Sequence, residues 1–432
     1  MTLKDTSTFT VFRISVVVAS WTPPQLAVAA RRRNSPPSRV ELLEQILRKL
    51  TLFDYLKCRR VCRSWRHIVD EAVATKGTIC SPAPQLPFLM LLPESLQSGT
   101  LSDITQEDTS YTNIAAPRTW KGNVDGVYSV EGWMVFQKFY YDRGYGLVMF
   151  FNPVSGEEFE LPHLHVPLYR RSVDTTVYIK LVVSYAPNSS DFFVVACATI
   201  LPYMMQQLAF CKVADKSWTL ITKDEYGPTY FHQFVILDWK LYVTSRELDD
   251  SVSVTVFNLR DSNIITSERL VMLNPNAIPK EFHVELKDGV SCCTNESEVG
   301  ITRDGDELFL VIYLIEHVLG NIQCELTKGF RIFKLDICGP RWIEIEDLGD
   351  RVLLIDDFRI QVISAKKINL RGKLSGGNCV FFSLLNTNTL IPDRGVFSLK
   401  DKSVKPLTFH PSLQDFLYGL WFMPSPLVVK QE

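Results

Sequence analysis

Histidine and acidic side chains that could bind a metal occur in this sequence in incomplete sets. His163 and His165 form an isolated His-x-His pair, and no third ligand can be identified for them in the sequence. Asp304 and Asp306 flank Gly305, as at the start of a calcium-binding loop, but Leu and Val fill the region where the later ligands would lie. We therefore expect the histidines to lie in a loop and the acidic pair to form a hairpin turn.

Cysteine and nucleophile motifs are equally incomplete. The ten cysteines are scattered, several of them within apolar, strand-like segments such as FFVVACATI, and no Cys-x-x-Cys pair is present. Cys58 and Cys62 would share one helical face, where we expect core thiols rather than a zinc site. The sequence has no P-loop, no G-x-S-x-G and no H-E-x-x-H motif. These observations predict a chain without catalytic, metal-binding or cofactor-binding residues, and the thiol usage fits a reducing compartment.

The elements that would position functional side chains begin with a helical segment. Between residues 38 and 70, apolar residues recur at three- and four-residue steps, which places them on one face of a helix. Asp54 can cap a second helix, because its carboxylate can accept hydrogen bonds from the free amides of the first turn. Trp65 continues the apolar positions, with arginines between them. The segment therefore predicts two or three short amphipathic helices.

This segment resembles an F-box in residue type and spacing. The resemblance rests on the runs ELLEQIL, L-x-x-x-D-Y-L and RRVCRSWR, in that order. It implies a small helical module that docks on the Skp adaptor of a Skp–cullin–F-box ubiquitin ligase. Ser38 and Arg39 stand where the family usually has Leu-Pro, a pair that normally belongs to the adaptor contact. The residues expected to make the adaptor contact, or to form the core beneath it, are Leu42, Leu43, Ile46, Leu47, Leu50, Asp54, Tyr55, Leu56, Val61, Cys62 and Trp65.

Two other interpretations of the helical segment follow from its residues. It could be a packed helical hairpin with Trp65 and the leucines in its core, or a helix-turn-helix DNA-binding motif, since RRVCRSWRH is basic. The net charge of -2 and the isoelectric point near 6.4 give no domain-wide positive footprint for phosphate. We therefore expect no nucleic-acid partner.

The segments on either side of the F-box-like helices are predicted to lack regular structure. Residues 1–37 are expected to be a disordered or targeting extension, whose apolar run from Phe9 to Trp21 is broken by Arg13 and is too short to span a membrane. Their low acidic content is shared with transit peptides, so mitochondrial or other organelle targeting is an alternative to a nuclear or cytoplasmic location. Residues 75–94 are expected to be a connector, because closely spaced prolines exclude a helix there.

Residues 95–432 contain an internal repeat of two strands joined by a turn. The first strand reads GWMVFQ, DFFVVAC, KLYVTS, ELFLVIY or NCVFFS, and it is dominated by aromatic and β-branched residues. Hairpin turns are expected at Asn152-Pro153, Asp215-Lys216 and Lys400-Asp401, just after the second strand. Each second strand carries an anchor phenylalanine; these residues are Phe151, Phe210, Phe257, Phe333 and Phe397.

The repeat predicts a β-propeller, with a β-sandwich pair as the alternative. A blade takes roughly 40 to 50 residues, and longer intervals can hold an insertion or a degenerate blade, so the repeats correspond to about six or seven blades. Trp218 and Trp342 occupy matching places in two repeats, which indicates packing between blades rather than stacking on a substrate. The expected fold class is α+β multidomain: a small F-box helical module at residues 38–74, followed by a mainly antiparallel β domain.

The β domain extends the resemblance to the whole chain. The segment PQLPFLMLLP, followed by GWMVF, FFNPVSGEEFELP, KLVVSYAP and GFRIFKLD, is similar to a large plant group of F-box proteins with a long C-terminal domain of unknown function. The resemblance implies a non-enzymatic adaptor that tethers an unknown substrate protein to the Skp adaptor and, through it, to a cullin. One alternative is a degenerate F-box protein that no longer engages the ligase. The other is a propeller that binds or transforms a small ligand, for which the sequence shows no convergent polar residues.

Overall fold

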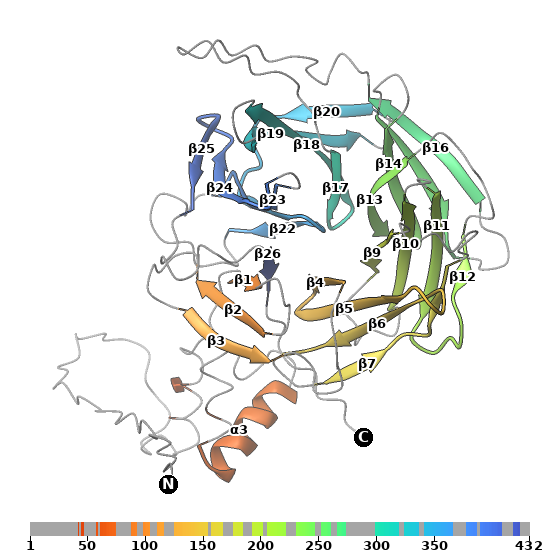
Figure 1. Cartoon of the computed structure of the whole chain (residues 1–432). Coiled ribbons are helices and arrows are strands. Elements are labelled where there is room, and N and C mark those ends of the chain that lie inside the picture. Colours follow the sequence, from red (N-terminus) through yellow and green to blue (C-terminus); the bar gives the residue numbers. More distant parts are fainter. Residues whose placement is uncertain are drawn as a thin grey trace, which may run out of the picture.

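The structure, a computed structural model, is a β-propeller preceded by a helical segment (Figure 1). The strands of its described part form six sheets that stand around a common centre, as predicted for a propeller and not for a sandwich. The number of blades stays a prediction, because stretches between the sheets lie outside the described residues. The structure describes residues 42, 45–46, 58, 61–74, 88–92, 98–103, 110–115, 125–153, 157–166, 176–184, 192–201, 205–221, 230–246, 252–260, 266–273, 299–318, 324–336, 341–365, 377–386, 389–407 and 418–423.

The helix that the structure describes, α3 (Arg63–Ala74), lies at the end of the predicted F-box segment. The Arg66 amide donates to the Cys62 carbonyl at 3.0 Å, which starts the helical hydrogen-bond pattern. Trp65 and Ile68, three residues apart, are partly buried on one face, whereas Arg66 is exposed. The helix is therefore amphipathic, as its sequence predicts. None of the described helical residues forms a helix long and apolar enough to cross a membrane.

Four of the sheets share one pattern: their strands are antiparallel and follow the order of the sequence, with the first strand at the centre of the ring and the last at its rim (Figure 1). The second sheet contains β4 (Gly126–Val130), β5 (Trp133–Tyr140), β6 (Tyr145–Phe151), β7 (Glu158–Glu160) and β8 (Leu164–His165), which pairs with β6. The third contains β9 (Thr176–Val183), β10 (Phe193–Leu201), β11 (Met205–Lys212) and β12 (Thr219–Leu220). The fourth contains β13 (Tyr230–Leu237), β14 (Lys240–Arg246), β15 (Val252–Asn258) and β16 (Thr266–Leu273). The fifth contains β17 (Val299–Asp304), β18 (Glu307–Val318), β19 (Cys324–Asp336) and β20 (Arg341–Ile345).

The sixth sheet departs from this pattern at its inner edge. Its innermost strand returns antiparallel to β21, and β21 then pairs in parallel with β23, so that Val352 lies opposite Cys379. A left-handed backbone at Gly377 and Asn378 leads the chain into β23. In order from the centre, the sheet contains β22 (Ile360–Ser364), β21 (Arg351–Asp356), β23 (Cys379–Leu385), β24 (Pro392–Ser398) and β25 (Ser403–Pro406).

The first sheet combines the two ends of the described chain. Leu89 lies opposite Trp421, so the last strand forms the inner edge of the sheet that the first strand begins. Strand β1 falls within residues 75–94, which the sequence assigns to a connector, and its five residues are all buried. The ring is thus closed by backbone hydrogen bonds between distant parts of the sequence. In order from the centre, the sheet contains β26 (Tyr418–Phe422), β1 (Phe88–Leu92), β2 (Ser98–Asp103) and β3 (Ser110–Ala115).

The predicted repeat corresponds to the middle strands of five sheets. Its first strand is β5, β10, β14, β18 or β23, and its anchor phenylalanine lies on the next strand outward, β6, β11, β15, β19 or β24. The three predicted turns lie between strands as expected; for example, the Lys212 amide donates to Asp215 at 2.9 Å in the turn after β11. The predicted hairpin at Asp304–Asp306 is confirmed as well, because Asp304 pairs with Glu307.

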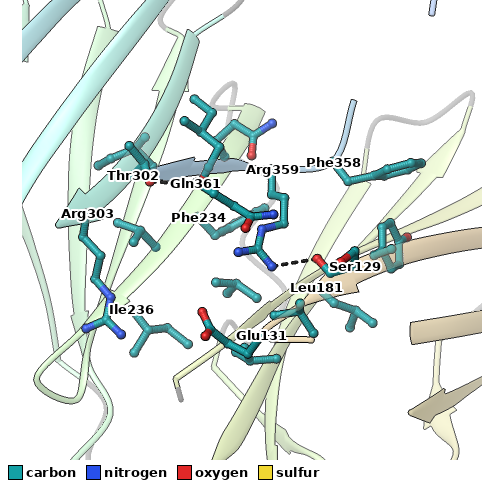
Figure 2. Close-up of a pocket in the computed structure, with 18 of the residues that line it drawn as sticks. Ser129, Glu131, Leu181, Phe234, Ile236, Thr302, Arg303, Phe358, Arg359 and Gln361 are labelled. Carbon is teal, nitrogen blue, oxygen red and sulfur yellow. Dashed lines mark hydrogen bonds between the residues drawn. The ribbon is translucent and has the colours of Figure 1, made fainter. Parts of the chain in front are cut away.

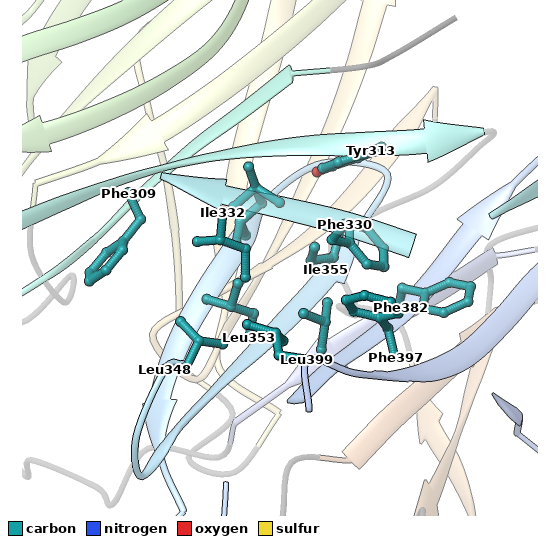
Figure 3. Packing of buried hydrophobic residues seen from close by; sticks show 13 residues of the cluster. Phe309, Tyr313, Phe330, Ile332, Leu348, Leu353, Ile355, Phe382, Phe397 and Leu399 are labelled. Carbon is teal, nitrogen blue, oxygen red and sulfur yellow. The ribbon is translucent and has the colours of Figure 1, made fainter. Parts of the chain in front are cut away.

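The hydrophobic core lies between neighbouring sheets. Figure 3 shows the layer between the fifth and sixth sheets, where the Phe330 ring lies 5.5 Å from Phe382 and 5.7 Å from Phe397. A Cβ at Gly329 would lie 2.9 Å from the Phe397 ring, so glycine permits the close approach. Each sheet buries its faces only against its neighbours, which is why the repeat needs a closed ring.

The described cysteines are divided between the core and the surface. Cys197, Cys211 and Cys379 are buried in strands, and burial raises the pKa of each thiol to about 12. Cys62 is exposed and Cys58 is partly exposed. The expectation that this pair forms core thiols is therefore wrong for Cys62, because it lies in the turn that precedes α3 rather than on the buried face of the helix.

Candidate functional site

The innermost strands surround a cavity of about 380 Å³ at the centre of the propeller (Figure 2). Its walls come from β4, β9, β13, β17 and β22, with Met423 following β26. These strands are not part of the repeat found in the sequence, which covers the middle strands. The cavity is therefore assembled by the ring as a whole.

Arg359 extends into this cavity from the start of β22 (Figure 2). Its Nη1 atom donates a hydrogen bond of 2.6 Å to the Ser129 carbonyl at the end of β4. Burial lowers the pKa of the guanidinium, while Glu131 and Asp356 act in the opposite direction. An arginine remains protonated under these conditions, so the cavity holds a positive charge.

Asp356 fixes the turn that presents Arg359. Its Oδ1 atom accepts the amides of Phe358 at 3.1 Å and Arg359 at 3.0 Å, and its Oδ2 atom accepts the Trp421 amide at 3.1 Å. Burial of the carboxyl group raises its pKa to about 6, and these hydrogen bonds act against the rise. One side chain thus sets the β21–β22 turn and joins it to β26.

Two further cations line the cavity, and each bonds to a backbone carbonyl of another sheet: Lys180 of the third sheet to the fourth, and Arg303 of the fifth sheet to the third. Lys180 Nζ donates to the His232 carbonyl at 3.0 Å, and Arg303 Nη2 donates to the Ser184 carbonyl at 2.9 Å. The remaining lining contains the carboxylate of Glu131 and a mixture of apolar and uncharged polar side chains. A concave site with apolar walls and a few convergent polar groups is the usual form of a small-molecule site. None of these residues stands out in the sequence. The signal that was present is a cation within an apolar strand, as in TVYIKLVV.

The histidines and tryptophans singled out in the sequence take part in packing. The His163 ring stacks on Tyr145 at 4.2 Å, with Nε2 at 3.7 Å from the Glu160 carboxylate. Within the described residues, no group of three or more His, Cys, Asp or Glu residues could hold a metal ion. Trp218 packs between the second and third sheets and Trp342 between the fourth and fifth, which confirms the predicted role between blades.

The residues predicted to dock on an adaptor are described in part. Leu42, Ile46 and Val61 are exposed at 45%, 48% and 64% of their surface, Cys62 is exposed, and Trp65 is partly buried. Exposed apolar side chains on a small helical module are suited to contact a partner. The structure does not separate this role from a core role for the other predicted residues, which lie outside the described part: Leu43, Leu47, Leu50, Asp54, Tyr55 and Leu56.

Comparison with known proteins identifies both regions of the chain. The model of the F-box domain matches residues 40–73, and the model of the KIB1-4 beta-propeller matches residues 101–405. An F-box protein of Arabidopsis thaliana is 24% identical over 413 residues, which cover 90% of this chain and 93% of that protein.

Solved structures resemble the chain more distantly. The match to YjhT covers 75% of this chain and 98% of that one at 13% identity, with a TM-score of 0.30. A DUF4784 family protein from Bacteroides caccae is matched over 79% of this chain and 75% of its own, at 12% identity and a TM-score of 0.33. TM-scores this low carry no argument about the chain.

The helical segment and the ring of sheets together define an F-box protein with a β-propeller domain. The chain belongs to the KIB1-4 beta-propeller family, whose model covers most of its length.

Proposed function

We propose that this protein is the substrate-recognition subunit of a Skp–cullin–F-box E3 ubiquitin ligase. The observation that carries the proposal is an F-box match at residues 40–73 directly before a propeller. The F-box would dock on the Skp adaptor and, through it, on the cullin, while loops of a six-bladed propeller, counted as one blade per sheet, would bind a substrate protein. Ubiquitin transfer would take place on other subunits. The chain would act by raising the effective concentration of the substrate near them.

The exposed apolar side chains of the F-box support adaptor docking. Leu42 and Ile46 are four residues apart on a helix, so they lie on the same side, and both are about half exposed. Burial of apolar groups against a partner lowers the free energy of the complex by roughly 25 cal/mol per Å² of surface removed from water. A partner helix that covers these residues would therefore be stabilised mainly by apolar contact.

The first experiment is co-purification of the full chain with a Skp adaptor. The double variant Leu42→Ala, Ile46→Ala removes exposed side chains, so the propeller should keep its far-UV circular dichroism spectrum while adaptor binding weakens by about tenfold or more. Tyr178→Ala is a matched control, because Tyr178 is 56% exposed but lies on β9 of the propeller. Failure of the folded wild-type chain to bind the adaptor would refute the proposal.

A degenerate F-box is the second candidate, and Ser38 and Arg39 favour it. If these residues have abolished docking, the double variant Ser38→Leu, Arg39→Pro should restore adaptor binding to a chain that otherwise lacks it. The protein would then be a stand-alone propeller that binds a partner without promoting its ubiquitination. Equal binding by the wild type and this variant would leave the ligase subunit as the supported function.

We place the protein in the nucleus or the cytoplasm, where such ligases would meet their substrates. A fusion to a fluorescent protein tests the location directly. Organelle import would instead support a targeting role for residues 1–37.

A further inference from the structure

The charged side chains around the central cavity are mainly cationic. Lys180, Arg303 and Arg359 face a single lining carboxylate, that of Glu131, which gives the lining a formal charge of +2. The whole chain has the opposite sign, with a net charge of -2. A cavity enclosed by protein concentrates the field of such charges and raises the local concentration of counter-ions. The cavity is therefore electrostatically suited to an anion.

Arg359 has hydrogen-bonding capacity to offer that anion. Within the described part of the chain, its guanidinium donates one hydrogen bond, to the neutral carbonyl of Ser129. A guanidinium carries five N–H groups in a planar fork that matches a carboxylate, sulfonate or phosphate. Asp356 holds the backbone of this arginine in place through three backbone amides, so the head of the side chain is positioned before a ligand arrives.

Apolar side chains share the rest of the wall with uncharged polar ones, which include Gln233 and Gln361. Leu181, Phe234, Ile236 and Ile301 come from three different sheets and line the same cavity as the cations. The volume of about 380 Å³ falls within the usual range of small-molecule sites, roughly 300 to 1,000 Å³. A simple inorganic ion would leave these apolar surfaces uncovered, whereas a molecule with an apolar body would fill the cavity.

We propose that the central cavity binds a small amphipathic anion, a molecule with an apolar body and one anionic head group. The head group contacts Arg359, and the body lies against Leu181, Phe234 and Ile236. This site is separate from the F-box, so the proposal holds whether or not the chain docks on a ligase.

The test uses two probes that share an apolar body. The first is 8-anilinonaphthalene-1-sulfonate, which carries a sulfonate, and the second is N-phenyl-1-naphthylamine, which is the same ring system without the charge. Fluorescence titration of the full-length chain should show saturable binding of the sulfonate at one site per chain. The neutral amine should bind about tenfold more weakly, and added salt should weaken only the sulfonate.

Two cavity variants should shift the sulfonate affinity in opposite directions. Arg359→Gln removes the cation and should weaken binding about tenfold, whereas Glu131→Gln removes the nearby negative charge and should strengthen it about threefold. Lys405→Gln is the matched control, since it removes an exposed cation from β25, the rim strand of the sheet that carries Arg359. This control should leave the affinity unchanged.

The Glu131 variant keeps the test decisive if Arg359→Gln disturbs the fold, because Arg359 also joins β22 to β4. Glu131 is exposed in the turn after β4, and its substitution removes no buried contact. Stronger sulfonate binding by Glu131→Gln supports the proposal. Equal affinity for the two probes, or an unchanged sulfonate affinity in both folded variants, would overturn it.

Discussion

At the scale of single residues, Asp356 has an unusual protonation equilibrium for a carboxyl group that holds a turn. It is buried, accepts three backbone amides, and has a pKa raised by burial to about 6 from an ordinary value of 3.8. The folded protein therefore binds this proton more tightly than the unfolded chain does. The resulting contribution to stability is fully present below pH 3.8 and is lost as the pH rises through about 6.

The variant Asp356→Asn tests this linkage. The difference in unfolding free energy between the wild type and Asp356→Asn should fall by up to about 3 kcal/mol between pH 4 and pH 7, because only the wild type ionises. Urea unfolding followed by tryptophan fluorescence at several pH values measures it. Glu344→Gln provides a contrast, since a hydrogen bond from Arg331 lowers the pKa of Glu344 and its stabilisation is lost as the pH falls instead. If the difference in unfolding free energy between the wild type and Asp356→Asn does not change with pH, the raised pKa does not belong to Asp356.

Gly377 shows how one residue permits the unusual connection of the sixth sheet. Its φ is +76°, and a Cβ there would lie 2.7 Å from the backbone carbon of Asp350. The close approach allows Asn378 Oδ1 to accept the Leu348 amide at 2.9 Å, just before β23 begins. Glycine thus relieves both backbone strain and a steric clash at this point.

Gly377→Ala should lower the free energy of unfolding by about 3 to 4 kcal/mol, as the sum of a left-handed backbone and an overpacked contact. Gly305→Ala is the control, because its φ of +57° is also left-handed but a Cβ there meets nothing within 4 Å. It should cost about 1 kcal/mol. Denaturant midpoints of the two variants measure the difference, and equal losses would show that the clash with Asp350 is relieved at no cost.

At the scale of elements, the closing strand β26 depends on Trp421. The side chain is fully buried, its Nε1 donates to the Ile355 carbonyl at 2.8 Å, and its ring meets Phe381 edge-on. These contacts join the first sheet to the sixth. The strand therefore contributes to packing between sheets as well as to its own sheet.

Trp421→Phe should destabilise the protein by about 2 to 3 kcal/mol, because it leaves the Ile355 carbonyl without its donor and opens a gap. Trp342→Phe is the matched comparison, since the Trp342 Nε1 atom is buried without a hydrogen-bond partner in the described part of the chain. Trp342→Phe should therefore change the free energy of unfolding by less than about 1 kcal/mol. Thermal unfolding of both variants gives the ranking, and the reverse order would contradict these roles.

At the scale of the whole molecule, ring closure requires both ends of the described chain. The closing strand contributes Leu420, Trp421 and Phe422, all of which are almost fully buried. Loss of a large buried side chain costs about 3 to 5 kcal/mol, and a whole domain is stable by only about 5 to 15 kcal/mol. The free energy lost on removal of β26 should therefore exceed the free energy of unfolding of the propeller.

A chain that ends at residue 417 should lose its cooperative thermal transition, whereas one that ends at residue 423 keeps β26 and should retain it. Differential scanning calorimetry distinguishes the two. A synthetic peptide of residues 416–425 should restore the transition to the shorter chain by pairing with β1. A cooperative transition in the shorter chain without the peptide would show that the ring does not depend on this closure.

The F-box match, the propeller class and the middle strands of five sheets could all be predicted from the sequence. These features depend on local patterns: apolar residues at helical spacing, and aromatic strands such as ELFLVIY followed by an anchor phenylalanine. The predicted turns at Asp215-Lys216 and Asp304–Asp306 are local as well. Each of these signals is complete within about ten to twenty residues, so neighbouring sequence is sufficient to reveal it.

The way the ring closes and the residues that meet at its centre depend on the three-dimensional arrangement of the sheets. The pairing of Leu89 with Trp421 joins strands from opposite ends of the described chain, and no local pattern specifies such a partner. Lys180, Arg303 and Arg359 are single cations on separate inner strands, and they form one site because the strands converge on the axis. The physical reason is that each sheet buries its faces against both neighbours, so the arrangement of its inner edge is fixed only when the ring is complete.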